Sequence, residues 1–404
     1  MEYLASLREE VRNLQGDGRG KALLVVSSGS FLLIGVQMIF PVMLPKLRTV
    51  YGLSLTTAGA LLTALWVANA VGQLPGGMLA DELGEGTTLL ISVVASAVTL
   101  LLLVTVGSVL ALFATTVLFG LGLALYGVAR YTAIYDLYPD RAGTTIGLVL
   151  ASADAGQALL PPVAGFVAVT VAWEFGFGFT IPVFVLVATG LYVYVPRRTS
   201  PATRDTTRSP FADVRTVLTG LRRRSTGYGT AILFVYVTIW VAFTSLYPTY
   251  LIEVKGLSST VAAAVFGSFF AMGVVTKPLA GAVYDRVGAR LSLLAIGLVS
   301  GLALAAVPLV AGVLPLVVVT VSVAPILGTG TVSQSYLIDS FVADVKGTGL
   351  GAVRSGAIAI AAVMPTVFGA TAERGFFDEM FLVLAGLAVL MVLFVLLIPD
   401  EPSA

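Results

Sequence analysis

Long apolar runs alternate with short polar breaks along the whole chain. Each run supplies about 20 mostly apolar residues, the length that a helix needs to cross the roughly 30 Å hydrocarbon core of a bilayer. Twelve such runs occur, at residues 22–45, 54–79, 87–107, 109–137, 143–169, 177–195, 229–252, 258–283, 290–311, 313–338, 347–370 and 378–398. The pattern predicts an all-α membrane protein with twelve transmembrane helices.

Composition and charge agree with this class and exclude several others. Of the 404 residues 57% are apolar and 11% charged, whereas a soluble domain carries roughly a quarter charged residues. A net charge of +1 leaves no surplus of Lys and Arg for binding nucleic acid. The chain has no His and no Cys, which are the ligands, bases or nucleophiles of zinc, haem, iron–sulfur, thiol and Ser-His-Asp sites. We expect no enzyme activity, no metal and no cofactor, and any proton transfer must use carboxylates.

Polar segments divide the chain into five parts. Residues 1–21 are polar with amphipathic spacing, which we interpret as a short cytoplasmic helix at the membrane surface. Residues 22–196 and 229–398 each hold six spans, residues 197–228 form a basic cytoplasmic linker, and residues 399–404 form a tail. We interpret the linker as a solvated connection, with binding of anionic lipids as the alternative.

Basic residues are unevenly distributed among the loops. If both termini are cytoplasmic, the inner segments hold 16 basic residues, the outer segments four, and the spans three. Basic residues accumulate in cytoplasmic loops of membrane proteins. The distribution therefore predicts a multi-pass protein of the cytoplasmic (inner) membrane with both termini inside the cell.

The two halves of the chain repeat each other at an offset of 204 residues. The coinciding pairs are Gly52 and Gly256, Gly77 and Gly281, Asp81 and Asp285, Gly84 and Gly288, Gly143 and Gly347, Gly147 and Gly351, Pro161 and Pro365, and Gly165 and Gly369. Because each half holds an even number of spans, both halves insert in the same orientation. Two parallel halves around a cleft are the arrangement that a rocking carrier needs.

The loop after the eighth span carries a family motif. Its residues include Gly281, Asp285, Arg286, Gly288 and Arg290. This stretch resembles the inner loop Gly-x-x-x-Asp-Arg-x-Gly-Arg-Arg of the major facilitator superfamily. The resemblance extends over the twelve spans, the linker and the repeat, and it implies that family's fold of two pseudo-symmetric six-helix halves. The first-half copy keeps Gly77, Asp81 and Gly84 but has acidic residues or glycine where the motif is basic.

The two motif aspartates end long helices at the predicted cytoplasmic face. A carboxylate there can lie against the positive N-terminal end of a neighbouring helix. The family's pseudo-twofold arrangement implies that Asp81 faces the start of the eleventh helix and Asp285 the start of the fifth. Arg286 and Arg290 could pair with Asp339. We predict that these contacts form a gate between the halves, and the alternative is that they are surface charges that only set the topology.

Four charged residues lie within spans: Arg130, Asp154, Lys277 and Arg354. Each costs roughly 2.5 to 3.5 kcal/mol on insertion scales and is a candidate functional residue. Three cations with one carboxylate are tolerable only if they line a watery cavity, pair with Asp154 or meet an anionic ligand. The alternatives are that Lys277 and Arg130 snorkel toward the cytoplasm, and that Arg354 and Asp154 form a structural ion pair.

Polar and aromatic residues deep in other spans complete the predicted substrate site. Trp66, Asn69 and Gln73 share one stripe of the second span, and Gln73 is the repeat counterpart of Lys277. The remaining candidates are Gln37, Tyr236, Trp240 and Gln334. Packing is the alternative for the aromatic residues. Lys46, Arg48 and Glu253 are interpreted as anchors at the membrane interface.

The balance of charges within the spans favours an anionic substrate. After Asp154 neutralises one cation, up to two remain for a carboxylate, phosphate ester or inorganic oxyanion. We predict a monomeric secondary transporter in membrane lipid, an antiporter or symporter that moves a small anion by alternating access, with Asp154 as the proton- or ion-coupling residue. A proton-coupled exporter of lipophilic compounds is the alternative, and a transporter-like sensor is a remote one.

Overall fold

The structure is a computed structural model that describes residues 19–199, 224–340 and 346–398. The first half comprises α2 (Arg19–Tyr51), α3 (Leu55–Leu83), α4 (Glu85–Thr105), α5 (Val109–Leu137), η2 (Pro139–Arg141), α6 (Ala142–Thr170), α7 (Phe175–Gly178) and α8 (Ile181–Tyr194). The second half comprises α10 (Arg224–Glu253), α11 (Ser259–Ala306), η3 (Val307–Leu309), α12 (Val313–Val323), α13 (Ile326–Ser340), α14 (Lys346–Ala361), α15 (Met364–Glu373) and α16 (Phe377–Leu396). Most of the predicted N-terminal segment, most of the predicted linker and the whole predicted tail lie outside the described residues.

The twelve predicted spans appear as eleven long apolar stretches. Helix α11 contains two of the spans. They are separated by a kink at Gly288, where the backbone leaves helical geometry (φ 78°, ψ 174°). The tenth and eleventh spans are each formed by two successive helices, α12 with α13 and α14 with α15, and the second helix of each pair begins beside Pro325 or Pro365. Proline cannot continue a helix but fits the first turn of a new one. The predicted all-α fold is confirmed.

Local sequence determines where several helices begin. Ser54, Ser108 and Ser258 have extended backbones just before α3, α5 and α11, and each hydroxyl accepts a hydrogen bond from a backbone N–H in the first turn. This contact satisfies a donor that the helix itself leaves unpaired. The repeat is visible here too, since Gly52 and Gly256 precede two of these caps with φ of 64° and 70°.

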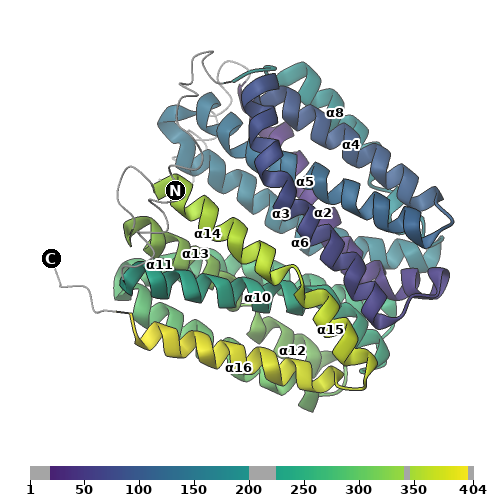
Figure 1. Cartoon of the computed structure of the whole chain (residues 1–404), viewed down its shortest axis with the longest axis vertical. Coiled ribbons are helices and arrows are strands. Elements are labelled where there is room, and N and C mark those ends of the chain that lie inside the picture. Colours follow the sequence, from purple (N-terminus) through teal and green to yellow (C-terminus); the bar gives the residue numbers. More distant parts are fainter. Residues whose placement is uncertain (1–18, 200–223, 341–345, 399–404) are drawn as a thin grey trace, which may run out of the picture.

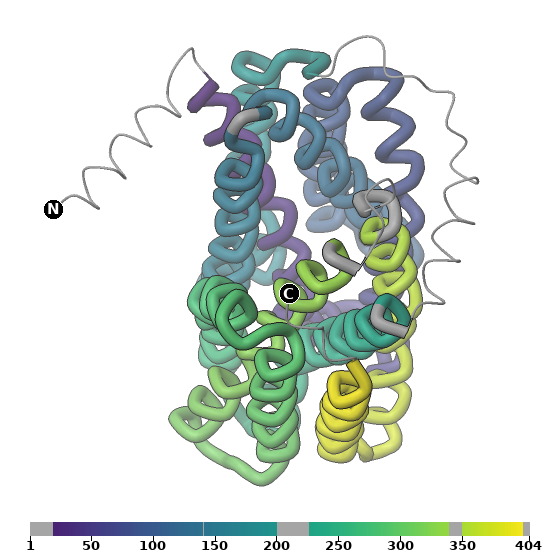
Figure 2. Tube along the Cα trace, turned by 90° about the vertical axis from the view of Figure 1, so that its left-hand side faces the viewer, coloured from purple at the N-terminus to yellow at the C-terminus, as the bar shows by residue number. Residues whose placement is uncertain are grey.

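The two halves lie side by side, with their helices running in the same general direction (Figure 1). Helix α6 packs against α11, α3 against α15, and α2 against α10. We call the end of the bundle where α3 and α8 end and α10 begins the linker end. The opposite end, where α2, α10 and α15 end, is the far end. Figure 2 views the molecule from the side of the linker end. The helices of the first half, purple to blue, lie largely above those of the second half, green to yellow.

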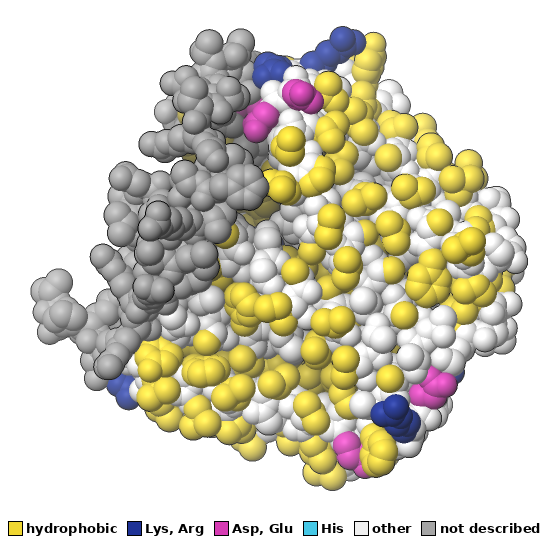
Figure 3. Space-filling view, viewed as in Figure 1, with side chains coloured by type: hydrophobic (Ala, Val, Ile, Leu, Met, Phe, Trp, Pro, Cys, Tyr) yellow, Lys and Arg dark blue, Asp and Glu magenta, His cyan; other side chains and the backbone are white. Residues whose placement is uncertain are grey.

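Large apolar side chains face outward along the bundle. Leu110, Leu186 and Leu302 are 83%, 71% and 73% exposed. On the face drawn in Figure 3, charged side chains occur near the two ends, and apolar side chains cover the surface between them. So much apolar surface is stable in lipid rather than in water. The chain is therefore a multi-pass membrane protein.

Each half has an aromatic core of its own. In the first half the ring of Phe40 lies 5.4 Å from Phe119 and 4.9 Å from Phe177, centroid to centroid. In the second half Phe243 stacks on Tyr247 at 4.4 Å. Because such close-packed cores resist deformation, we treat each half as a rigid body, and the site lies where the two bodies meet.

Candidate functional site

The two halves approach most closely at the far end. A Cβ atom added to Gly59 of α3 would lie 2.1 Å from the carbonyl oxygen of Pro365 in α15. A Cβ added to Gly165 of α6 would lie 2.6 Å from the Cβ of Ala263 in α11. Small residues permit this approach because a larger side chain would hold the backbones apart. The far end is therefore closed on both sides of the bundle.

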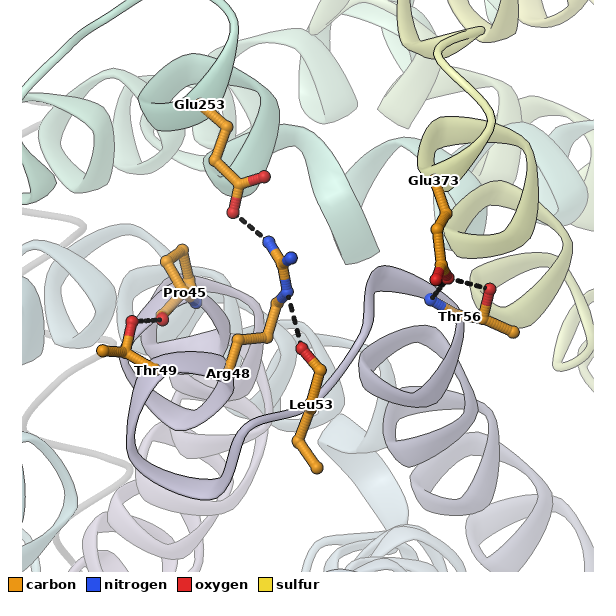
Figure 4. A network of polar contacts seen from close by, with 7 residues as sticks. All are labelled: Pro45, Arg48, Thr49, Leu53, Thr56, Glu253 and Glu373. Atoms are coloured by element: carbon orange, nitrogen blue, oxygen red, sulfur yellow. Dashed lines mark hydrogen bonds and ion pairs between the residues drawn. The ribbon is translucent and has the colours of Figure 1, made fainter.

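Two polar contacts also join the halves at the far end (Figure 4). Arg48 of α2 forms an ion pair with Glu253 of α10. Glu373, the last residue of α15, accepts hydrogen bonds from the hydroxyl of Thr56 and from its backbone N–H, the latter at 2.9 Å. The first turn of α3 leaves its N–H groups unpaired, and the carboxylate satisfies one of them. Arg48 and Glu253, predicted as interfacial anchors, thus form an ion pair between the halves.

The linker end is open where the far end is closed. Among the described residues, a Cβ atom added to Gly143, Gly147 or Gly351 would have no neighbouring atom within 4 Å. Asp81 and Asp285 are exposed, and neither forms an ion pair with a residue in the described ranges. The gate predicted for these aspartates is not engaged in this conformation, and it stays a prediction for a conformation in which the linker end is closed.

The other residues of the predicted gate lie around the same end. Gly84 and Gly288 have φ of 91° and 78°, a conformation that favours glycine. An added Cβ at Gly77 or at Gly281 would make only an ordinary contact at 3.8 Å. Arg286 is exposed and Arg290 half-buried, and the side chain of Asp339 lies outside the description.

The first-half loop departs from the family motif for a structural reason. A Cβ added to Gly86 would lie 1.9 Å from the carbonyl oxygen of Pro196. The buried carboxylate of Glu85 accepts a hydrogen bond from the backbone N–H of Thr199 at 2.9 Å, and Arg198 donates to the carbonyl of Glu82 at 2.6 Å. This loop holds the start of the linker, and basic side chains at positions 85 and 86 would not fit these contacts, whereas the contact of Glu82 uses only its backbone.

Arg130, Asp154, Lys277 and Arg354, here called the charged group, lie between the closed far end and the open linker end. Nζ of Lys277 in α11 is 2.6 Å from Oδ1 of Asp154 in α6, and the two side chains are 31% and 17% exposed. The ion pair joins the two halves, and its partial exposure is consistent with contact with water. The alternative in which Asp154 pairs with Arg354 is wrong, because the packing of α6 on α11 gives Asp154 a different partner.

Two arginines of the charged group approach the same hydroxyl. Arg130 is 5% exposed; its Nη2 donates to the hydroxyl of Tyr131 at 3.0 Å, and its Nη1 lies 3.5 Å from Oγ of Ser30. Arg354, an exposed residue of α14, approaches the Tyr131 hydroxyl from the second half. Within the described parts of the chain neither guanidinium has a carboxylate partner. The burial of Arg130 also argues against snorkelling to the surface.

Polar residues of α3, α10 and α14 surround these charges. Oγ of Ser355 in α14 donates to Oε1 of Gln73 in α3 at 3.0 Å, one residue from Arg354. Tyr236 of α10 is buried, close to the charges of both Arg354 and Asp154. The predicted residues Gln73 and Tyr236 therefore lie with the charged group.

The remaining predicted residues lie on other parts of the central helices. The rings of Trp66 in α3 and Trp240 in α10 meet edge to face, with centroids 5.2 Å apart. Gln37 of α2 is 3% exposed. Asn69 of α3 and Gln334 of α13 are half-buried, and no hydrogen bond among the described residues joins them to the charged group.

Three residues that shape these contacts are absent from the predicted site: Tyr131, Ser355 and Glu373. Tyr131 and Ser355 each follow a predicted cation in the sequence, but successive helix residues point about 100° apart, so adjacency gives no signal of a shared site. Glu373 ends a span, and its repeat counterpart Val169 is uncharged, so the repeat gives no signal either.

Comparisons with known proteins agree with this architecture. The family model of the Major Facilitator Superfamily matches residues 26–333. Similar solved structures include a mutant of the nucleoside transporter NupG. The two sequences are 12% identical, the TM-score is 0.79, and the match covers 94% of this chain and 100% of the NupG chain. A D-xylose-proton symporter is 17% identical with TM-score 0.73, covering 93% and 96%.

At such low identity these two structures support the fold alone. No curated protein matches the chain. The family model, however, covers more than half of the sequence, and the two six-helix halves agree with it. The chain therefore belongs to the major facilitator superfamily of membrane transporters.

Proposed function

We propose that this transporter moves a small organic or inorganic anion across the cytoplasmic membrane by alternating access. The observation that carries the proposal is the approach of Arg130 and Arg354, one from each half, to the hydroxyl of Tyr131 without an acidic partner in the described ranges. A buried cation such as Arg130 is costly unless it is paired, and Arg354, which is exposed, can reach a ligand bound beside it. A carboxylate, phosphate ester or oxyanion would pair with both guanidiniums at once.

The difference between the two ends supports alternating access. Carriers of this architecture expose a central site to one side of the membrane at a time by rocking one half against the other. The far end is closed by glycine contacts and by the Arg48–Glu253 ion pair, and the linker end is open. Because basic loops favour the cytoplasm, we infer that the linker end is cytoplasmic and that this conformation faces inward.

The ion pair between Lys277 and Asp154 supports a coupling role for Asp154. A proton on Asp154 would remove its charge and release Lys277 to bind the anion, which would give proton symport. If the anion displaces an ionised Asp154 instead, the same site would exchange one anion for another. In both cases Lys277 binds either the carboxylate of Asp154 or the substrate anion. Asp154 and the substrate therefore compete for Lys277.

Thermal stability of the purified protein tests the substrate class. The probes are acetate, oxalate, nitrate, phosphate, a neutral sugar and a lipophilic cation, and a ligand at 100 times its Kd adds about 2.7 kcal/mol of stability. We expect one class of anion to raise the melting temperature of the native chain and not that of Arg354→Ala. Lys46→Ala removes a cation from an exposed position near the end of α2 and should respond like the native chain. Stabilisation only by lipophilic cations would contradict the anion proposal.

Removing the charge at position 154 tests the coupling residue. Asp154→Asn keeps the size of the side chain but not its charge, so Lys277 loses its carboxylate partner and the affinity for an anion such as oxalate, measured at fixed pH, should rise. Uptake of that anion into vesicles driven by a proton gradient should be lost in the variant. Proton-driven uptake at the native rate in Asp154→Asn would exclude Asp154 as the coupling residue.

A further inference from the structure

Three buried N–H groups of the central helices have no acceptor in the described parts of the chain. They are Nε2 of Gln37 in α2, Nε1 of Trp240 in α10 and Nε of Arg130 in α5. Buried donors in native proteins are nearly always paired, with protein groups, water or a ligand. Because all three are donors, the missing partner is a group that accepts hydrogen bonds.

Gln37 lies on the face of α2 that contacts both α5 and α10. On α2, Ser30, Gln37 and Arg48 lie on one stripe, because their spacings are close to whole numbers of helical turns. Ser30 lies beside Arg130 of α5, and Arg48 pairs with Glu253 of α10. Gln37 therefore lies on the same face as these two contacts, one with the helix that carries Arg130 and one with the helix that carries Trp240.

Gln37, Trp66 and Trp240 lie at a similar depth in the bundle. At about 1.5 Å per residue, each is roughly 15 to 20 Å along its helix from the far-end contacts. By the same count Asp154 and Lys277 are roughly 17 and 21 Å from the contact between Gly165 and Ala263, and Arg354 is roughly 28 Å from Glu373. Gln37 and the tryptophans are thus nearer to the closed end than Arg354, and the ion pair lies between them.

The two tryptophans form an apolar wall on the side of the charged group that faces the closed far end. We call this position the tryptophan level. Their rings meet at an interplanar angle of 75°, one from each half. Trp66 is buried and Trp240 is partly exposed. Aromatic rings bind planar or apolar groups, and the indole N–H adds one polar contact.

We propose that the substrate is an organic anion with two parts. Its charged head binds the cations of the charged group, and its planar or apolar body lies against the tryptophans and carries an oxygen that accepts hydrogen bonds from Gln37 and Trp240. This inference rests on the proposed anion transport and narrows it. A bare inorganic oxyanion would fill the head site but is too short to reach the tryptophan level.

Three probe anions separate the contributions of head, ring and acceptor. Acetate has only the head, benzoate adds the ring, and 4-methoxybenzoate adds an oxygen at the far side of the ring. Binding to the full chain in detergent is measured by isothermal titration at fixed pH and ionic strength. We expect affinity to rise in that order, with at least a tenfold difference between acetate and 4-methoxybenzoate.

Two variants test the donors directly. Trp240→Phe keeps an aromatic ring but removes the N–H, and Gln37→Leu removes the amide. Each should lower the affinity for 4-methoxybenzoate to that for benzoate, three- to tenfold, and change benzoate binding less than twofold. Trp173→Phe makes the same substitution away from the central helices, on the segment before α7, and should bind all three probes like the native chain.

The outcomes distinguish this inference from the proposed function. Equal affinity for acetate and 4-methoxybenzoate, or native affinity for 4-methoxybenzoate in Trp240→Phe, would overturn the inference and leave anion transport standing. Binding of neutral solutes but of no anion would overturn the proposed function itself. Since Gln37→Leu changes a buried position, Trp240→Phe decides the case if that variant does not fold.

Discussion

The far end and the linker end of the bundle use similar residues with opposite results. On helix α6, Gly165 near the far end is in tight contact with Ala263, whereas Gly147 near the linker end faces open space. Charges follow the same division. Arg48 and Glu253 are paired at the far end, and the motif aspartates at the linker end are not paired with described residues. If the halves rock as rigid bodies, as proposed above, the contacts of one end are made at the expense of the other.

The ion pair and the glycine packing at the far end differ in how strongly they hold the two halves together. The far-end ion pair is partly exposed, at 21% and 33% for its side chains, and such pairs contribute about 0.2 to 1 kcal/mol. A contact that contributes so little free energy can be lost at the far end if a similar contact forms at the linker end. The glycine packing is different, because an added side chain excludes it altogether. Backbone approach should therefore control the far end more strongly than charge does.

The largest expected effect comes from filling the space at Gly59. In Gly59→Leu the new side chain would overlap the carbonyl of Pro365, so the far end should open. The chain has no cysteine, which allows Thr63→Cys, at the contact with Thr366, to serve as a single reporter. Gly59→Leu should increase its labelling by a membrane-impermeant maleimide at least tenfold.

The matched variant at the open end is Gly147→Leu, where no atom of residues 19–199, 224–340 or 346–398 lies within 4 Å of an added Cβ. It obstructs closure of the linker end instead, so it should leave the labelling of Thr63→Cys unchanged or lower it. An equal increase in both variants would show that the glycines affect general stability rather than the choice between the two ends.

A smaller effect is expected when the far-end ion pair is removed. Arg48→Ala should increase labelling of the same reporter by a factor of about 1.4 to 5, given about 0.2 to 1 kcal/mol for an exposed pair. The increase should shrink at high salt, because salt screens exposed charges. Lys46→Ala, which removes an exposed cation from the same helix, should have no effect. Similar labelling in both variants would mean that the ion pair does not stabilise closure.

The smallest effect is expected at the hydrogen bond between Ser355 and Gln73, which joins the halves below the far end. A neutral hydrogen bond contributes about 0.5 to 1.5 kcal/mol when buried, and less where water competes. Ser355→Ala should therefore change the labelling at most about twofold, and Ser355→Thr, which keeps the hydroxyl, should leave it unchanged. A larger change in Ser355→Ala than in Arg48→Ala would reverse the proposed ranking of contacts.

Much of the fold follows from the sequence because each span must satisfy the same local requirement. Helix α5 spans Val109–Leu137, the range that apolar length predicts, and Ser108 caps it as its residue type suggests. The breaks before Pro325 and Pro365 were not predicted, since proline also occurs inside continuous helices such as α10. Whether a proline interrupts a helix depends on what packs around it.

The candidate site was predicted less completely. The four charges within the spans are visible in the sequence because a charge in lipid is costly. Their partners are not visible, since the partner of Asp154 depends on which helix α6 packs against. Tyr131, one residue from Arg130 in sequence, belongs to the site only because Arg354 of the other half comes to its hydroxyl.

By itself the sequence determined the solvent, the number of spans, the repeat and the family, because each depends on residue type and spacing along the chain. Only the tertiary structure decided which end is closed and which charges are paired. The ion pair between Arg48 and Glu253 joins residues 205 positions apart, and such contacts depend on how two rigid halves are placed against each other. Two placements can satisfy every local requirement of the same sequence equally well, so local patterns cannot choose between them.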